Sequence, residues 1–186
     1  MALTSTMHRI LLDISDVDRG VYEQAALRIA QHPSESDAYL IARVLAYGLE
    51  LAPDLVLGRG IAFPEEPTMS VTDPTGQVRR WIEVGVPSAD RLHRVAKLAD
   101  EVVLYAHRTL QPLRDELRGR ALHRAEAVRV FTFPPPLLDK VAAQLGRQCQ
   151  LSLLRHEGIL YVTTPDGVTH ETPLLEQTLA AVGRGA

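Results

Sequence analysis

Residues 78–107 read VRRWIEVGVPSADRLHRVAKLADEVVLYAH, and they contain the clearest structural pattern in the chain. Residues 78–86 alternate between apolar and polar side chains, which is typical of a strand with two different faces. In residues 88–100 the apolar side chains recur three and four positions apart, which indicates a helix. Residues 102–107 form a short apolar run that predicts a strand buried on both faces. Strand, helix and strand in this order form a βαβ unit with parallel strands and a right-handed crossover.

The flanking segments add hairpins and further helices to this unit. Asp73-Pro74-Thr75-Gly76 predicts a turn that leads into residues 78–86. Residues 21–31 suit either a helix or the return arm of a hairpin, and we favour the strand. Because the βαβ unit needs parallel strands and hairpins need antiparallel ones, we expect a mixed sheet. The other expected strands are residues 4–16, 55–63, 68–72, 128–133, 151–155 and 159–164, and the other expected helices are residues 34–51 with Ser34 as N-cap, 109–118, 137–147 and 173–182.

Length and composition predict one ordinary globular domain. The chain has 186 residues, of which 46% are hydrophobic and 23% are charged, so it is long enough to bury a core. The 20 basic and 23 acidic residues give a net charge of −3, which provides no overall field to attract nucleic acid or an anionic membrane. A nucleic acid would therefore need a local basic patch. We expect a single domain over residues 1–186.

Cysteine usage and hydropathy limit the cellular setting. Cys149 is the only cysteine, which excludes an internal disulfide and a thiolate zinc cluster. No apolar run of about 18 residues is present that could span a membrane. The first 14 residues carry charges and lack the pattern of a signal peptide. We expect a cytoplasmic protein without a membrane partner; the sequence does not determine its oligomeric state.

Glu83 is the most informative polar residue because its strand should be central in the sheet. Alternation places it on the same face as Trp81 and opposite to Ile82 and Val84. A buried carboxylate is costly unless it is paired, hydrogen-bonded or bound to a metal ion. Two interpretations therefore stay open. Glu83 either pairs with an arginine of a neighbouring element or joins other acids around a metal ion.

The topology could bring further acids close to Glu83. Glu65 and Glu66 precede the neighbouring strand, and Glu35 lies at the start of the first helix. A group of one to three carboxylates from separate elements is the usual form of a Mg²⁺ site. Taken alone, Glu35 is also explained as a first-turn helix acid and Asp73 as a turn residue.

Two groups of basic residues could contact phosphate. Arg91, His93, Arg94 and Lys97 lie opposite the apolar stripe of the helix over residues 88–100, where solvation alone also explains them. Residues 108–129 contain six arginines against three acids, which suits phosphate contact. This second stretch lacks interleaved aromatic residues, so stacking on single-stranded bases is poorly supported there.

Several motifs resemble those of the YaeQ family, and the resemblance extends over nearly the whole chain. That family is regarded as a variant of the PD-(D/E)XK restriction-endonuclease-like fold, with its reaction and substrate unestablished. The resemblance implies an α/β fold in which helices flank a mixed sheet with a restriction-endonuclease-like core and added hairpins. The motifs are Met1-Ala2-Leu3, His32-Pro33-Ser34-Glu35, Gly60 with Glu66-Pro67, Trp81-Ile82-Glu83-Val84-Gly85-x-Pro87, Arg91 and Gly158-x-Leu160-Tyr161-Val162.

The resemblance also implies a metal site. Glu35, Glu66 and Glu83 would bind Mg²⁺, with Glu65 as the alternative to its neighbour. In a working nuclease of this kind, the metal lowers the pKa of a bound water that attacks the phosphodiester. The implied function is a Mg²⁺-dependent phosphodiester hydrolase.

The lysine that such a nuclease carries two residues after its strand acid is absent. Gly85 occupies that position, so the next helix would have to supply the cation from Arg94 or Lys97. The expected catalytic residues are therefore Glu83, Arg94 and Lys97. Two alternatives remain: a degenerate member that binds nucleic acid or a protein partner without cleavage, and an interaction domain whose acids only form ion pairs.

Overall fold

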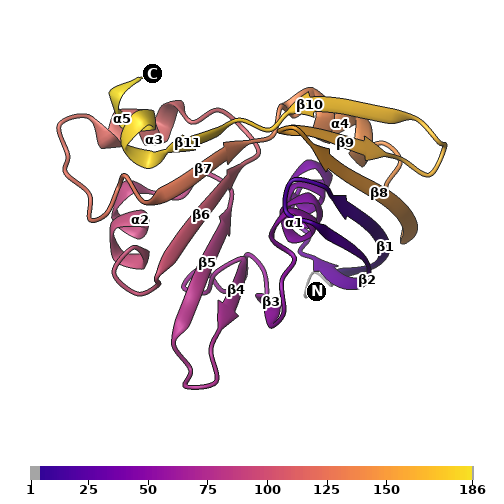
Figure 1. Cartoon of the computed structure of the whole chain (residues 1–186), viewed down its shortest axis with the longest axis horizontal. Coiled ribbons are helices and arrows are strands. Elements are labelled where there is room, and N and C mark those ends of the chain that lie inside the picture. The colour runs from indigo at the N-terminus through magenta and orange to yellow at the C-terminus, as the bar shows by residue number, and fades with distance from the viewer. Residues whose placement is uncertain (1–4, 186) are drawn as a thin grey trace.

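The computed structural model describes residues 5–185, which form two mixed β-sheets and five helices (Figure 1). The strands are β1 (Thr6–Asp16), β2 (Val21–Gln31), β3 (Leu55–Leu57), β4 (Met69–Thr72), β5 (Val78–Val84), β6 (Glu101–Ala106), β7 (Val128–Thr132), β8 (Gln148–His156), β9 (Ile159–Thr163), β10 (Thr169–Pro173) and β11 (Glu176–Thr178). The helices are α1 (Asp37–Glu50), α2 (Ala89–Val95), α3 (Gln111–Leu117), α4 (Pro135–Ala142) and α5 (Leu179–Arg184). The sheets have the strand orders β10-β9-β8-β1-β2 and β11-β7-β6-β5-β4-β3.

The predicted βαβ unit is present in the six-stranded sheet. β5 and β6 are parallel, with Arg80 opposite Glu101 and Val84 opposite Tyr105, and α2 connects them. β7 continues the parallel part, whereas β3, β4 and β11 pair antiparallel. The sequence predicted one mixed sheet, whereas the structure has two. β1 of the hairpin β1–β2 pairs in parallel with β8, and these strands belong to a second sheet.

Helix α1 lies between the two sheets and shares its core with both. Its side chains at positions 40–46 are all buried, which is expected of a helix that has apolar surroundings on several sides. The other face of the six-stranded sheet is covered by α2, α3 and α5 around a second core (Figure 1). The predicted alternation in β5 is confirmed. Ile82 and Val84 belong to the core with α1, and Trp81 belongs to the core with α2.

Several element boundaries differ from the sequence-based expectation. The strand expected over residues 55–63 ends at Leu57, because residues 58–67 turn back and Gly58 passes the carbonyl oxygen of Pro67 so closely that a Cβ would collide with it. The helix expected over residues 173–182 begins only at Leu179, since the preceding residues pair in β10 and β11. The strand at residues 21–31 is confirmed. Thr4 and the Met1-Ala2-Leu3 motif lie outside the described residues.

The start of α1 also differs. Ser34 is not its N-cap, because the backbone N–H of Glu35 donates to the carbonyl of His32 and forms a turn first. Ser36 is the cap instead, and its Oγ accepts from the backbone N–H of Tyr39 at 3.2 Å. This turn directs the Glu35 side chain toward the interior rather than along a solvated first helical turn. Across residues 5–185, none of the helices has the length and apolar character needed to cross a membrane.

Candidate functional site

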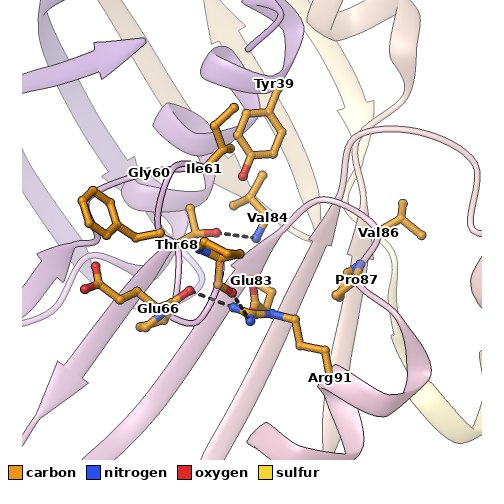
Figure 2. A pocket seen from close by; sticks show the side chains of 13 residues that line it. Tyr39, Gly60, Ile61, Glu66, Thr68, Glu83, Val84, Val86, Pro87 and Arg91 are labelled. Carbon is orange, nitrogen blue, oxygen red and sulfur yellow. Dashed lines mark hydrogen bonds and ion pairs between the residues drawn. The ribbon is translucent and has the colours of Figure 1, made fainter. Parts of the chain in front are cut away.

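Two neighbouring pockets open where the parallel strands β5 and β6 end. The first has a volume of about 280 Å³ and lies between Tyr39, the loop over residues 58–67 and Arg91 of α2 (Figure 2). The second has a volume of about 300 Å³ and lies between the residues before α1 and those after β6. Both are lined by Tyr39, Ile61 and Val86, and we call the two pockets together the groove. The carboxyl ends of parallel strands are the usual place for ligands in α/β sheets.

The two pockets differ in chemistry. We call the first the apolar pocket, because most of its wall consists of Ile61, Phe63, Pro64, Pro67, Val84, Val86 and Pro87. Its polar lining comes from Tyr39, Thr68, Glu66, Glu83 and Arg91. We call the second the polar pocket, because Ser34, Glu35, Ser36, His107 and Arg108 line it.

Glu83 forms the ion pair that was one of its two interpretations. Its Oε1 accepts from the indole N–H of Trp81 and from Nε of Arg91, each at 2.7 Å. Nη2 of Arg91 also lies 2.7 Å from Oε1. Burial raises the pKa of Glu83, while the indole hydrogen bond and the charge of Arg91 act in the opposite direction. Glu83 therefore pairs with Arg91 of α2 on the same face of β5 as Trp81, which is the face that the alternation predicts.

Arg91 connects three segments and is not free to meet a phosphate. Its Nη2 donates to the carbonyl of Glu66 at 2.7 Å, and its Nη1 donates to the carbonyl of Pro64. Its guanidinium carbon lies 5.7 Å from the centre of the Trp81 ring, in the range of a cation–π contact. Arg91 thus fastens the loop over residues 58–67 to the end of β5.

The other acids of the predicted metal site each have an arginine of their own. Glu66 accepts from Nε of Arg59 at 2.8 Å, and its carboxylate points away from Arg91 (Figure 2). Glu65 lies 3.4 Å from Arg94 in an exposed pair. Glu35 is buried, and its Oε1 accepts from Nη1 of Arg43 at 2.8 Å.

The sheet itself separates Glu35 from Glu83. Glu83 points to the α2 face of β5 with Trp81, whereas α1 packs on the face formed by Ile82 and Val84. Within residues 5–185, no group of three His, Cys, Asp or Glu side chains is arranged to hold a metal ion. Because a Mg²⁺ site of this kind needs carboxylate oxygens that converge on one point, the predicted ligand set Glu35, Glu66 and Glu83 does not fit that ion in this arrangement.

The predicted cations lie outside the groove. Arg94 and Lys97 are exposed and line neither pocket. In the basic stretch over residues 108–129, most arginines pair with acids or backbone carbonyls. Arg108 is the exception that matters here. It lines the polar pocket, is exposed, and has no ion pair among the residues that the structure describes.

Three residues of the site were not predicted. Tyr39 is half-buried at the junction of the pockets, and burial raises the pKa of its phenol. Its ring meets that of His107 edge to face, with the ring centres 5.1 Å apart. Burial and the nearby charge of Arg108 lower the pKa of His107, which favours the neutral imidazole. Arg43 had a visible signal, since it is a charge within an otherwise apolar run, whereas Tyr39 and His107 had none.

A nuclease of the type that the sequence resemblance implies would carry a lysine at position 85, but the backbone conformation at this position favours glycine. The φ of Gly85 is +130°, a region in which residues with a side chain are strained. A Cβ at this position would lie 3.7 Å from Cε2 of Tyr39, which is an ordinary contact, so backbone conformation is the obstacle and not space. The chain path into the groove is therefore incompatible with an unstrained lysine at position 85.

We expect Gly85→Ala to lower the free energy of unfolding by about 1–3 kcal/mol, the typical cost of a disallowed backbone conformation. Urea denaturation of the variant and the wild-type protein measures this difference. A variant as stable as the wild type would contradict the assigned backbone conformation.

The comparisons with known proteins agree on one family. The family model described as "YaeQ protein" matches residues 1–173, so the chain belongs to the YaeQ family. It is 26% identical over 165 residues to an uncharacterized YaeQ protein of Escherichia coli K12, covering 88% of this chain and 91% of the relative.

Two crystal structures of YaeQ proteins have the same fold. The protein from Pseudomonas syringae has a TM-score of 0.84 and 31% sequence identity, covering 94% of this chain and 96% of that one. The protein from Xanthomonas axonopodis pv. citri has a TM-score of 0.85 and 28% identity, covering 94% and 99% of the two chains. Two mixed sheets flanked by helices are therefore an architecture that this chain shares with YaeQ structures.

Proposed function

We propose that this YaeQ-family protein binds nucleic acid in the groove and does not hydrolyse it. The observation that carries the proposal is that Glu35, Glu66 and Glu83 each have an arginine partner. Their charges are thereby compensated, and the groove does not repel a phosphate as an open carboxylate cluster would. Among the described residues that line the groove, Arg108 at the polar pocket is an arginine without an ion pair, and it can pair with a phosphate in a bidentate manner.

The proposal includes a restriction-endonuclease-like core of the PD-(D/E)XK type that has lost cleavage. The βαβ unit with Glu83 near the end of β5 supports such a core. The missing lysine and the commitment of Arg91 to backbone carbonyls support the loss of activity.

A Mg²⁺-dependent phosphodiester hydrolase is the second candidate. It is favoured by one observation: the three acids all line the two pockets that share Tyr39, Ile61 and Val86. If a ligand displaced Arg91, the carboxylate of Glu83 would become available inside the groove. In that case Arg94 or Lys97 would have to approach from outside it.

Fluorescence anisotropy with labelled oligonucleotides tests the first candidate. We expect binding in EDTA that weakens with rising salt, and roughly tenfold weaker binding for Arg108→Glu. Arg28→Glu is the matched control, since it makes the same charge change at an exposed arginine that lines neither pocket and, among the described residues, has no ion pair. No binding, or equal effects of both variants, would overturn the proposal.

The hydrolase is decided by incubating the same oligonucleotides with Mg²⁺ and separating the products on a gel. We expect intact strands. Cleavage that disappears in Glu83→Gln would favour the hydrolase instead, and calorimetric titration of Mg²⁺ into both proteins would then show whether Glu83 binds the ion.

A further inference from the structure

The division of the groove into an apolar and a polar pocket matches the two halves of a nucleotide. A nucleobase has flat apolar faces and an edge of hydrogen-bonding groups, whereas its phosphate is charged and strongly hydrated. A phosphate in the apolar pocket would lose its water among proline, valine and isoleucine side chains, near the carboxylate of Glu83. In the polar pocket the same phosphate would meet the exposed guanidinium of Arg108.

We infer that the groove holds one nucleotide with an unpaired base, the base in the apolar pocket and the phosphate beside Arg108. This inference rests on the proposed function and names its ligand: a single strand, or a nucleotide turned out of a helix, rather than an intact duplex. A base that is paired and stacked cannot place its faces and its edge in a pocket.

The polar atoms of the apolar pocket can receive the edge of a base. The contacts of Trp81 and Arg91 with Glu83 all end on Oε1, and within the described chain Oε2 has no hydrogen-bond donor. Oε2 can accept from an N–H of the base, as carboxylates do from exocyclic amines. The aromatic ring of Tyr39, which lines both pockets, offers a face for stacking at their junction.

The dimensions of the two pockets suit a small ligand such as one nucleotide. The pocket of about 280 Å³ lies just below the range for small-molecule sites, roughly 300–1,000 Å³, and the pocket of about 300 Å³ lies at its lower bound. The loop over residues 58–67 forms one side of the apolar pocket, and Arg91 holds it through two carbonyls. The side wall is therefore fastened before the base enters.

Fluorescence anisotropy of three probes with the wild-type protein tests this inference. The probes are a short labelled single strand, the duplex of that strand, and the same strand with an abasic sugar in place of every nucleotide except the labelled one. The abasic strand keeps the phosphates and lacks the bases. We expect the single strand to bind roughly tenfold or more tightly than both other probes. Equal binding of single strand and duplex, or of intact and abasic strand, would overturn the inference and leave the proposed function standing.

A variant that fills the groove locates the base. Val86→Phe adds volume where the two pockets meet, and it should remove the preference for the intact strand over the abasic strand. Leu175→Phe makes a similar change at an exposed position that lines neither pocket, and it should keep the preference. An unchanged preference in Val86→Phe would overturn the placement of the base. If no probe binds the wild-type protein at all, the proposed function itself fails.

Discussion

Replacing Arg43 by methionine is expected to lower the free energy of unfolding by about 3–5 kcal/mol, the usual cost of breaking a buried ion pair on one side. The side chains of Arg43 and Glu35 are only 2% and 1% exposed, and their charged atoms lie 2.8 Å apart. Without the guanidinium, the carboxylate keeps a hydrogen bond from the backbone N–H of His32 and has no positive partner. Urea denaturation at neutral pH measures the loss.

Two further variants distinguish the effect of leaving a buried charge without a partner from the effect of removing any arginine. Arg94→Met breaks the exposed pair with Glu65, whose side chains are 58% and 78% exposed, and should cost less than about 1 kcal/mol. The double variant Arg43→Met/Glu35→Gln leaves no uncompensated charge and should recover most of the stability. If Arg43→Met costs no more than Arg94→Met, or the double variant recovers nothing, the buried pair is not what stabilises this end of α1.

The local features of the fold were predictable, because they depend on neighbours in sequence. The βαβ unit, the opposite faces of Trp81 and Ile82 in β5, and the turn at Asp73 follow from periodicity and turn chemistry. The helix boundaries were less predictable. In α2 the apolar spacing continues to Ala99, yet the helix ends at Val95 and a turn follows, so spacing alone did not fix its end.

The pairing of the site acids was not predictable, because it depends on which elements meet in space. Glu83 and Arg91 are eight residues apart and meet only because α2 folds back over β5. The alternation within β5 does not indicate whether the carboxylate of Glu83 faces an arginine or a metal ion. The separation of Glu35 from Glu83 also required knowing that α1 packs on the Ile82 face, a consequence of the second sheet that the sequence pattern did not predict.

The arginine partners matter for function because they determine the charge that a ligand meets. An unpaired carboxylate in the groove would repel phosphate unless a metal ion intervened, whereas a paired one is nearly neutral at a distance. Arg91 has the largest influence, since it binds both Glu83 and the loop that forms the apolar pocket. The same side chain therefore affects stability, pocket shape and the availability of Glu83.

Arg91→Met is accordingly expected to lower the free energy of unfolding by about 3–5 kcal/mol at neutral pH, and by less at acidic pH. Burial already raises the pKa of Glu83 above its ordinary value of 4.5, and removal of the guanidinium would raise it further. A carboxyl whose pKa is raised by folding contributes stability below its unfolded pKa and loses it as the pH rises through the folded pKa. Urea denaturation from about pH 4 to pH 7 measures how much lower the free energy of unfolding of the variant is than that of the wild type. This deficit should be smallest at the acidic end and grow toward neutrality.

The pH dependence distinguishes an uncompensated charge from a simple loss of packing. Arg91→Met/Glu83→Gln lacks the titrating carboxyl, so its deficit should be nearly independent of pH, with the contacts to the loop carbonyls and to the Trp81 ring missing. Arg59→Met is the control for the loop, because it removes the exposed partner of Glu66 and leaves Arg91 in place. A deficit of Arg91→Met that is equal at acidic and neutral pH would mean that the carboxylate of Glu83 does not depend on Arg91 for its charge. In that event the uncompensated acid could attract a cation, and the non-hydrolysing interpretation of the groove would lose its main support.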